Sequence, residues 1–252
     1  LVRSRGLGDV YKRQISCGGL RAVTVFESGI VDIPGTETPI TIRVVSIVSR
    51  GVDVSISPRE NSGPPCTTLT YTVTIKNTGN LGDNYNLTVG DNAGWGGNIW
   101  LDNYRLENIP QGENRTTTLR VRIPEDATGC TEGNIWVKAT SQGDNTKSDN
   151  DSCIAHASIV RGVQVVISPS SQENENGGTL KYTVTVKNLG NVRENFQLAK
   201  GDNAGWTLSL DDDWLLVPKR ENKTTKVTVR IPENAMGCTW DNIWIKATSK
   251  DN

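Results

Sequence analysis

The chain has 252 residues, a formal net charge of −1 and only 6% aromatic residues. This length suits two domains of ordinary size, and the near-neutral charge, without a long run of Lys or Arg, argues against a nucleic-acid partner. No stretch of the sequence approaches the ~18 apolar residues of a membrane span. Abundant Thr, Asn, Asp and Gly favour thin β-sandwich cores over a helical enzyme.

The N-terminal segment differs from the rest of the chain. Residues 4–14 (SRGLGDVYKRQ) resemble the in-frame translation of a transposon-end adapter used in shotgun DNA libraries. We therefore expect residues 1–14 to be a sequencing artefact on a metagenomic fragment. In residues 15–50, short apolar pieces at 20–26 and 40–48 flank a Pro/Gly/Thr segment. We interpret 15–50 as the remnant of a preceding domain or a linker.

One strand pattern occurs twice. Residues 69–80 (LTYTVTIKNTGN) return as residues 180–191 (LKYTVTVKNLGN). Apolar side chains alternate with Thr and Lys, and this period of two predicts a half-buried strand. Asn and Gly at the end tolerate a positive φ, so we expect the strand to end in a turn.

The similarity extends over both halves of the chain. Residues 50–95 match 161–206 at 25 of 46 positions, and 109–140 match 217–248 at 20 of 32. Self-similarity at a domain-sized period indicates tandem copies of one fold. We place the first repeat at 51–160 and the second at 161–252.

Each repeat has short, regularly spaced strand signals and no helical period. In the first repeat the predicted strands are 52–57, 68–77, 84–89, 101–109, 116–123, 133–141 and 147–157. This spacing predicts an all-β chain of tandem antiparallel immunoglobulin-like β-sandwiches. The second repeat has no counterpart of residues 147–157, so we expect it to be C-terminally truncated, without its last strand and with an unpaired edge.

Four motifs carry a resemblance to a known family. V-x-V-x-I-S-P, Y-T-V-T-[IV]-K-N-x-G-N, D-N-A-G-W and V-R-I-P-E-x-A each occur in both repeats. This set resembles the NEW3/CARDB-like group, immunoglobulin-like repeats of archaeal and bacterial surface proteins that are also appended to secreted enzymes. The resemblance implies an extracellular or cell-surface location and a non-catalytic spacer or adhesion unit. It supplies no family site residues.

The cysteines predict a disulfide rather than a zinc site, because there is no C-x-x-C and only one histidine. If residues 143–146 form the hairpin turn, Cys153 lies opposite Trp136, and Cys130 precedes Trp136 by six residues. We therefore prefer a Cys130–Cys153 bridge, which would fix the last strand on the sandwich. The alternative is that all cysteines are free thiols of a cytosolic protein.

The other three cysteines have no clear partner. Cys238 occupies the position of Cys130 in the second repeat, where a partner would follow the last residue. Cys66 aligns with Gly177, so it is not a framework position, and its pairing with Cys17 is a weaker alternative.

Repeated polar positions suggest a metal or glycan site. Asp91 and Asp202, in the two G-D-N-A-G-W loops, are weak calcium candidates, although calcium needs six to eight oxygen ligands. We favour the alternative that Asp and Asn bond the local backbone while the Trp closes the core. Asn114 and Asn222 lie in equivalent N-glycosylation patterns before the same strand and are candidate glycosylation sites.

The tryptophans suggest a ligand platform. Alternation places Trp136 on the polar face of its strand, and Trp244 repeats it. The same alternation puts Trp240, Asn242, Trp244 and Lys246 on one face. Exposed indoles beside amides and Lys can stack on sugar rings, so Trp136, Trp240 and Trp244 are candidate carbohydrate-binding residues. The favoured alternative is that loops, a glycan or a neighbouring repeat cover them.

Together these patterns predict a non-catalytic structural or adhesion repeat of a large secreted or cell-surface protein, acting as a rigid spacer or stalk. The expected partners are neighbouring repeats, surface polysaccharide or other cell-surface proteins. No cofactor is expected unless calcium binds. A carbohydrate-binding module attached to a secreted hydrolase and a calcium-rigidified adhesin repeat are the alternatives.

Overall fold

The structure is a computed structural model that describes residues 13–15, 23–25 and 45–250. The chain forms two compact units, Leu1–Ser49 and Arg50–Asn252. In the first unit, the described residues form β1 (Arg13–Ile15) and β2 (Val23–Val25), which pair antiparallel. Cys17 and most of the apolar pieces expected at 20–26 and 40–48 lie outside the described residues.

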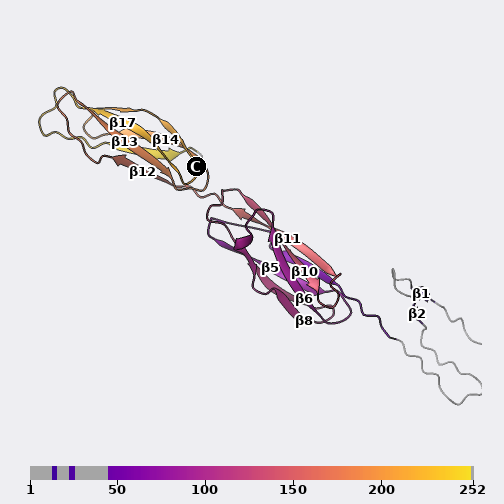
Figure 1. The fold of residues 1–252 in the computed structure, drawn as a ribbon. Coiled ribbons are helices and arrows are strands. Elements are labelled where there is room, and N and C mark those ends of the chain that lie inside the picture. Colours follow the sequence, from indigo (N-terminus) through magenta and orange to yellow (C-terminus); the bar gives the residue numbers. More distant parts are fainter. Residues whose placement is uncertain (1–12, 16–22, 26–44, 251–252) are drawn as a thin grey trace, which may run out of the picture. The chain divides into compact units, whose positions relative to one another are not determined.

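The first repeat is a sandwich of a four-stranded and a five-stranded sheet (Figure 1). Its strands are β3 (Val52–Ser57), β4 (Glu60–Gly63), β5 (Thr68–Asn77), β6 (Asp83–Asp91), β7 (Ile99–Leu101), β8 (Arg105–Ile109), β9 (Asn114–Arg122), β10 (Glu132–Ser141) and β11 (Ser148–Ala157). The sheet orders are β3-β5-β9-β7 and β4-β11-β10-β6-β8, and only the β4–β11 pair of these sheets is parallel. The prediction of antiparallel immunoglobulin-like sandwiches is confirmed.

The alternating strand behaves as its sequence predicts. β5 lies between β3 and β9, and its apolar residues Leu69, Tyr71, Val73 and Ile75 are all buried. They pack in one cluster with the buried residues of the other sheet. The Thr residues between them face outward, because successive side chains of a strand point to opposite faces.

The turn after β5 is held by an asparagine side chain instead of a positive φ. None of residues 77–80 has a positive φ. The buried Asn77 donates from Nδ2 to the carbonyl oxygens of Leu81 and Ile109, both at 2.9 Å, and its Oδ1 accepts from the Gly79 amide. Asn188 makes the same three bonds in the second repeat. One buried amide therefore fixes this turn in both repeats.

Two features of the first repeat differ from the sequence predictions. The predicted strand 101–109 is divided into β7 and β8, which belong to different sheets. Between them the amide of Asn103 donates to Thr117 Oγ1 at 3.0 Å, where the chain leaves the first sheet. In addition, β4 was not predicted, because its polar sequence forms a strand only through its pairing with β11.

The second repeat has the same plan with two strands fewer (Figure 1). Its strands are β12 (Val163–Ser168), β13 (Thr179–Asn188), β14 (Glu194–Gly201), β15 (Thr207–Leu210), β16 (Trp214–Val217), β17 (Asn222–Arg230) and β18 (Trp244–Ser249). The sheets are β12-β13-β17-β15 and β16-β14-β18. Counterparts of β4 and β11 are absent from the described residues, so β18 lies at the edge of its sheet there.

A buried carboxylate closes the same end of each repeat. Asp83 accepts a hydrogen bond of 2.5 Å from Ser141 Oγ and lies 3.6 Å from Arg50 Nη1. In the second repeat Glu194 contacts Ser249 and Arg161 in the same way. The pairing and hydrogen bonding compensate the cost of burying each charge.

Replacing Asn77 by Ala should lower the free energy of unfolding by about 2 kcal/mol, because one buried and one part-buried carbonyl group and one amide lose their partner. Urea unfolding followed by tryptophan fluorescence measures the change. The exposed Asn145→Ala is the control and should leave the midpoint in place. A midpoint for Asn77→Ala equal to that of the control would contradict the anchoring role.

Candidate functional site

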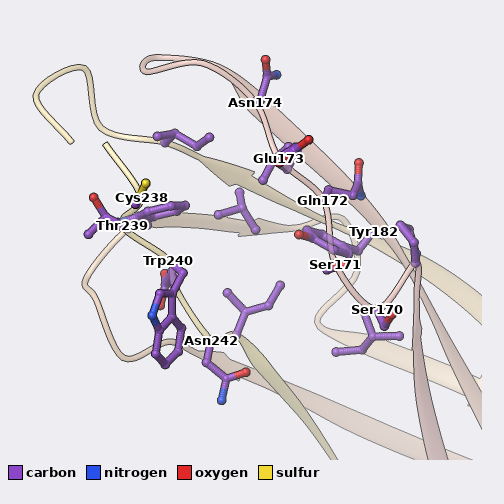
Figure 2. A pocket seen from close by; sticks show the side chains of 18 residues that line it. Ser170, Ser171, Gln172, Glu173, Asn174, Tyr182, Cys238, Thr239, Trp240 and Asn242 are labelled. Carbon is purple, nitrogen blue, oxygen red and sulfur yellow. The ribbon is translucent and has the colours of Figure 1, made fainter. Parts of the chain in front are cut away.

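The second repeat contains an open groove of about 610 Å³ (Figure 2). It is lined by β12 and the loop that follows, by β13 and β17, by Trp206, and by residues 238–243. Its wall carries the aromatic side chains Tyr182, Trp206 and Trp240 beside the polar side chains of the 170–174 loop. This mixture of aromatic and polar groups makes the groove a candidate binding site.

The groove occupies the place that β4 and β11 fill in the first repeat. Residues 171–174 align with β4, and residues 240–243 align with the start of β10. In the first repeat the start of β10, residues 132–134, pairs only with β11. Without that partner, the equivalent residues of the second repeat form no strand, and β18 begins only at Trp244.

Core side chains are uncovered along this groove. Ile167, Tyr182 and Ile243 are partly exposed in the second repeat. Their first-repeat counterparts, at positions 56, 71 and 135, are almost completely buried. The side-chain types are the same, so the difference in exposure reflects the cover that β11 gives to the core of the first repeat.

Two of the candidate platform tryptophans pack on glycine. Trp136 lies opposite Gly90, and Trp244 lies opposite Gly201, on the neighbouring strands. A Cβ atom on either glycine would come within 2.3–2.4 Å of the indole Cζ2, so each ring lies directly over a glycine backbone. Trp136 is 40% exposed and Trp244 is 49% exposed. Each indole thus covers the glycine of the neighbouring strand and remains about half exposed to solvent.

Trp240 differs from the other two tryptophans. It is 70% exposed, lies before the start of β18, and lines the groove together with Asn242 (Figure 2). The predicted common face of Trp240 and Trp244 assumed a continuous strand, and residues 240–243 form none. The common face itself stays a prediction.

The structure does not bring Cys130 and Cys153 together. The Cys130 amide donates to the carbonyl oxygen of Ala157 at 2.8 Å, so Cys130 lies four strand residues from Cys153. At the rise of a strand this separation is about 13 Å, whereas the Cα atoms of a disulfide lie about 4.4–6.8 Å apart. Both thiols are free, and the predicted bridge is wrong.

A register difference of one residue explains why Cys153 is buried. Cys153 pairs with Ile135, whereas the prediction placed it opposite Trp136. The loop between the paired residues Thr140 and Ser148 comprises residues 141–147, an odd number, and within it the Asp144 carboxylate accepts from the amide and hydroxyl of Thr146. A shift of one residue moves a side chain to the other face of the sheet. Cys153 therefore points into the core, where burial and the nearby Asp151 charge raise its pKa to about 12.

The other described cysteines are exposed and adopt a left-handed backbone conformation. Cys66, Cys130 and Cys238 have φ values of 68°, 65° and 63°. Gly177, the counterpart of Cys66, has a φ of 76°. These positions favour glycine, so their geometry marks tight turns instead of a bonding framework.

The acidic loop residues bond to the backbone around them. Asp91 Oδ1 accepts from the amides of Ala93 and Trp95 at 2.7 and 2.9 Å, and Asp202 accepts from the Gly205 amide. Trp95 is buried in the core cluster. Within residues 45–250, no group of three His, Cys, Asp or Glu side chains could hold a metal ion. These contacts support the Asx-turn interpretation, and calcium binding stays a prediction.

The glycosylation candidates lie at equivalent exposed places. Asn114 and Asn222 are the first residues of β9 and β17, and both side chains are exposed. Both sites are accessible for attachment, and glycosylation remains a prediction.

Sequence reasoning missed two carboxylates that protect a sheet edge. Asp149 Oδ2 accepts from the Val54 amide, and Asp151 Oδ2 accepts from the Ile56 amide, both at 2.8 Å. The acceptors belong to β11, whereas the amides lie on the outer edge of β3, in the opposite sheet. Alternate Asp residues followed by alternate small apolar residues, D-x-D-x-C-x-A-x-A, were the available signal.

The comparisons assign neither a family nor an activity. No family model and no curated protein sequence matches the chain. Solved structures with similarity include a protein of unknown function from Porphyromonas gingivalis W83, with 14% identity, a TM-score of 0.32, and coverage of 70% of this chain and 83% of that one. The YadV chaperone has 11% identity, a TM-score of 0.30, and coverage of 79% and 94%. The class 5 fimbriae chaperone CfaA has 12% identity, a TM-score of 0.29, and coverage of 77% of this chain and 99% of that one.

No helix among the described residues is long and apolar enough to span a membrane.

The pKa of Asp151 makes the first repeat sensitive to acid. Burial acts to raise this pKa, but hydrogen bonds from Arg59 and from the amides of Ser152 and Ile56 outweigh it and lower the pKa below 3.8. Because the folded pKa lies below the unfolded one, the carboxylate stabilises the fold above about pH 4. That contribution is lost as the pH falls through the folded pKa.

Asp151→Asn should therefore lower the free energy of unfolding by about 1–2 kcal/mol at pH 7, and the difference from the wild type should shrink below about pH 4. Urea unfolding between pH 2.5 and 7 measures this. Asp211→Asn, an exposed substitution in the other repeat, is the control. A difference that is constant with pH would contradict the assigned cause.

Proposed function

We propose that the chain is a non-catalytic structural or adhesion repeat of a large secreted or cell-surface protein, where it acts as a rigid spacer. Two copies of one sandwich follow each other, and each copy has the same asparagine-anchored turn and buried carboxylate. Repetition of a whole domain, together with its asparagine-anchored turn and its buried carboxylate, suits a protein whose function is to span a distance.

The observation that carries the proposal is the way the connection between the repeats is held. The buried Asn191 donates from Nδ2 to the Ser158 carbonyl oxygen at 2.9 Å and accepts from the Val160 amide at 2.8 Å. Its own amide donates to the Val160 carbonyl oxygen at 3.0 Å. The connecting residues 158–160 are thus bonded to the first turn of the second repeat. A short, bonded connection is expected to be stiffer than a free linker.

The described residues offer little for catalysis. His156, the single histidine, lies on β11 between Glu132, at 3.3 Å, and Glu60, at 3.7 Å. No serine or cysteine is recorded in hydrogen bonding with this histidine, as a nucleophile would be. Cys153 is buried as a neutral thiol with a raised pKa, which makes it a poor nucleophile. These features support a non-enzymatic role in which neighbouring repeats, surface polysaccharide or other surface proteins are the partners.

Asn191→Ala should make the two repeats reorient more independently, because the connecting residues lose two side-chain hydrogen bonds. ¹⁵N relaxation gives a rotational correlation time for each repeat, and the variant should show shorter, more nearly separate times. Asn145→Ala, on an exposed turn, should behave as the wild type. Repeats that already reorient independently in the wild type would refute the rigid spacer.

A carbohydrate-binding module is the second candidate, favoured by the half-open indoles of Trp136 and Trp244. Each ring lies flat over a glycine, a geometry that leaves an aromatic face for a sugar ring. Trp240 lies apart from both and would contribute only at the groove.

A glycan array separates the two candidates. If the module binds sugar, Trp136→Ala and Trp244→Ala should each reduce binding about tenfold or more, while Trp214→Ala, a similarly exposed tryptophan on β16, should not. The spacer proposal expects no saccharide signal for any of these proteins. Binding that persists in both variants would exclude the indole platform.

A further inference from the structure

The turn before β17 has an arginine where the same turn of the first repeat has a glycine. The Glu221 amide closes this turn by donating to the Pro218 carbonyl oxygen at 3.3 Å. Within the turn Arg220 has a φ of 59°, and the equivalent Gly112 has a φ of 76°. This left-handed conformation costs free energy for a residue that carries a Cβ atom. The turn itself therefore gives no reason for an arginine at this position.

The Arg220 side chain reaches the first repeat. Its Nη2 donates to the Glu125 carbonyl oxygen, and its Nη1 lies 3.5 Å from Oε1 of the Glu125 carboxylate. The adjacent Lys219 donates from Nζ to the Asp126 carbonyl oxygen at 2.8 Å and to Thr128 Oγ1 at 2.6 Å. Two neighbouring cations of the second repeat thus bind one loop of the first repeat.

The loop that receives these cations presents free acceptors to them. The Ala127 amide donates to the Pro124 carbonyl oxygen at 3.1 Å, so the loop is closed by a different carbonyl group. No other donor is recorded within residues 45–250 for the carbonyl oxygens of Glu125 and Asp126. Hydrogen bonds from a charged donor are stronger than those from a neutral one. Lysine and arginine are therefore well suited to hold this loop.

The two repeats also meet closely at a glycine of the same loop. The Gly129 amide donates to the Asn191 carbonyl oxygen at 3.2 Å. A Cβ atom on Gly129 would lie 2.7 Å from Val192 Cγ1 and 2.9 Å from Ile159 Cγ1. A Cβ atom on Gly237, the equivalent glycine of the second repeat, would have no atom within 4 Å. The contact at Gly129 thus has no space for a larger residue.

We propose that Lys219 and Arg220 form an electrostatic latch, which holds residues 125–128 of the first repeat and which high ionic strength releases. The inference rests on the proposed spacer function and names what controls the stiffness of the spacer. The Arg220 side chain is 44% exposed and that of Glu125 is 77% exposed. Salt screens exposed charges, because the Debye length falls from about 30 Å at 0.01 M to about 3 Å at 1 M. An exposed ion pair is also individually weak, so its release is reversible.

The latch is distinct from the contacts of Asn191. Those contacts join the Asn191 side chain to the backbone of Ser158 and Val160, and all of these groups are neutral. They should persist when salt is added. Ionic strength would therefore loosen the contact between the repeats while the short connection stays bonded to the second repeat.

The test uses the 252-residue chain and ¹⁵N relaxation, which gives a rotational correlation time for each repeat. At about 0.01 M sodium chloride the two repeats should share one correlation time. At about 1 M, after correction for viscosity, both times should shorten toward the value for a single repeat. The amide chemical shifts of residues 125–129 and 219–220 should change over the same salt range, whereas those of the strand interiors should stay constant.

Replacing Lys219 by Gln and Arg220 by Gly together should remove the latch without damaging the fold. The double variant should show the shorter correlation times already at low salt, and salt should have no further effect. The urea midpoint of the second repeat, followed by its amide signals, should stay the same or rise, because glycine suits the left-handed φ. Lys223→Gln, an exposed substitution on β17, is the control and should behave as the wild type.

Gly129→Ala tests the close contact without changing a charge. Its methyl group would collide with two apolar side chains, so the correlation times should shorten at low salt. Gly237→Ala is the matched control, because its methyl group would meet no atom. Neither glycine has a positive φ, so alanine suits the backbone at both positions. Equal correlation times in the two variants would contradict the close contact.

The outcomes separate the latch from the spacer. If the wild type shares one correlation time at low salt and keeps it at about 1 M, or if the double variant keeps it at low salt, the latch is refuted and the rigid spacer is retained. Independent reorientation of the two repeats in the wild type at low salt would refute both proposals.

Discussion

The pairing of β10 with β11 determines how the two repeats differ. In the first repeat, β11 pairs along the whole of β10, brings β4 into the sheet and covers the core with small side chains. In the second repeat no such strand is present among the described residues, and three changes follow from that. The start of β18 is shortened, the segment equivalent to β4 is a loop, and the middle of the core is open. A single strand thus organises one side of the sandwich.

One end of each sandwich has the same polar contacts in both repeats. Asn77 and Asn188 hold the turn after the central strand, and Asp83 and Glu194 hold the strand starts beside it. All four side chains are buried and hydrogen-bonded. The second repeat therefore keeps an ordered end at the connection between the repeats while its groove stays open. The buried polar networks fix the turn after the central strand, and β11 completes the apolar core of the first repeat.

The sequence predicted those parts of the fold that depend on local patterns. Alternation identified β3 and β5 to the residue, and repetition identified the tandem sandwiches. It could not predict β4, whose polar sequence becomes a strand only through a neighbour far along the chain. The site was predicted less well for the same reason. The Trp240 platform assumed a continuous strand through residues 240–243, and the Cys130–Cys153 bridge assumed that the loop before β10 returns to Cys153, whereas Cys130 is bonded to Ala157.

The odd length of the hairpin between β10 and β11 has a consequence for how this core could change. Adding or removing one residue there would leave the amino-acid sequences of both strands unchanged. It would, however, exchange the two faces of β11. Ser152, Ile154 and His156 would then turn toward Tyr71, and the carboxylates that cap β3 would turn to solvent. The length of a short surface loop therefore determines which side chains of β11 face the core. Small insertions at this exposed site would have effects as large as substitutions in the interior.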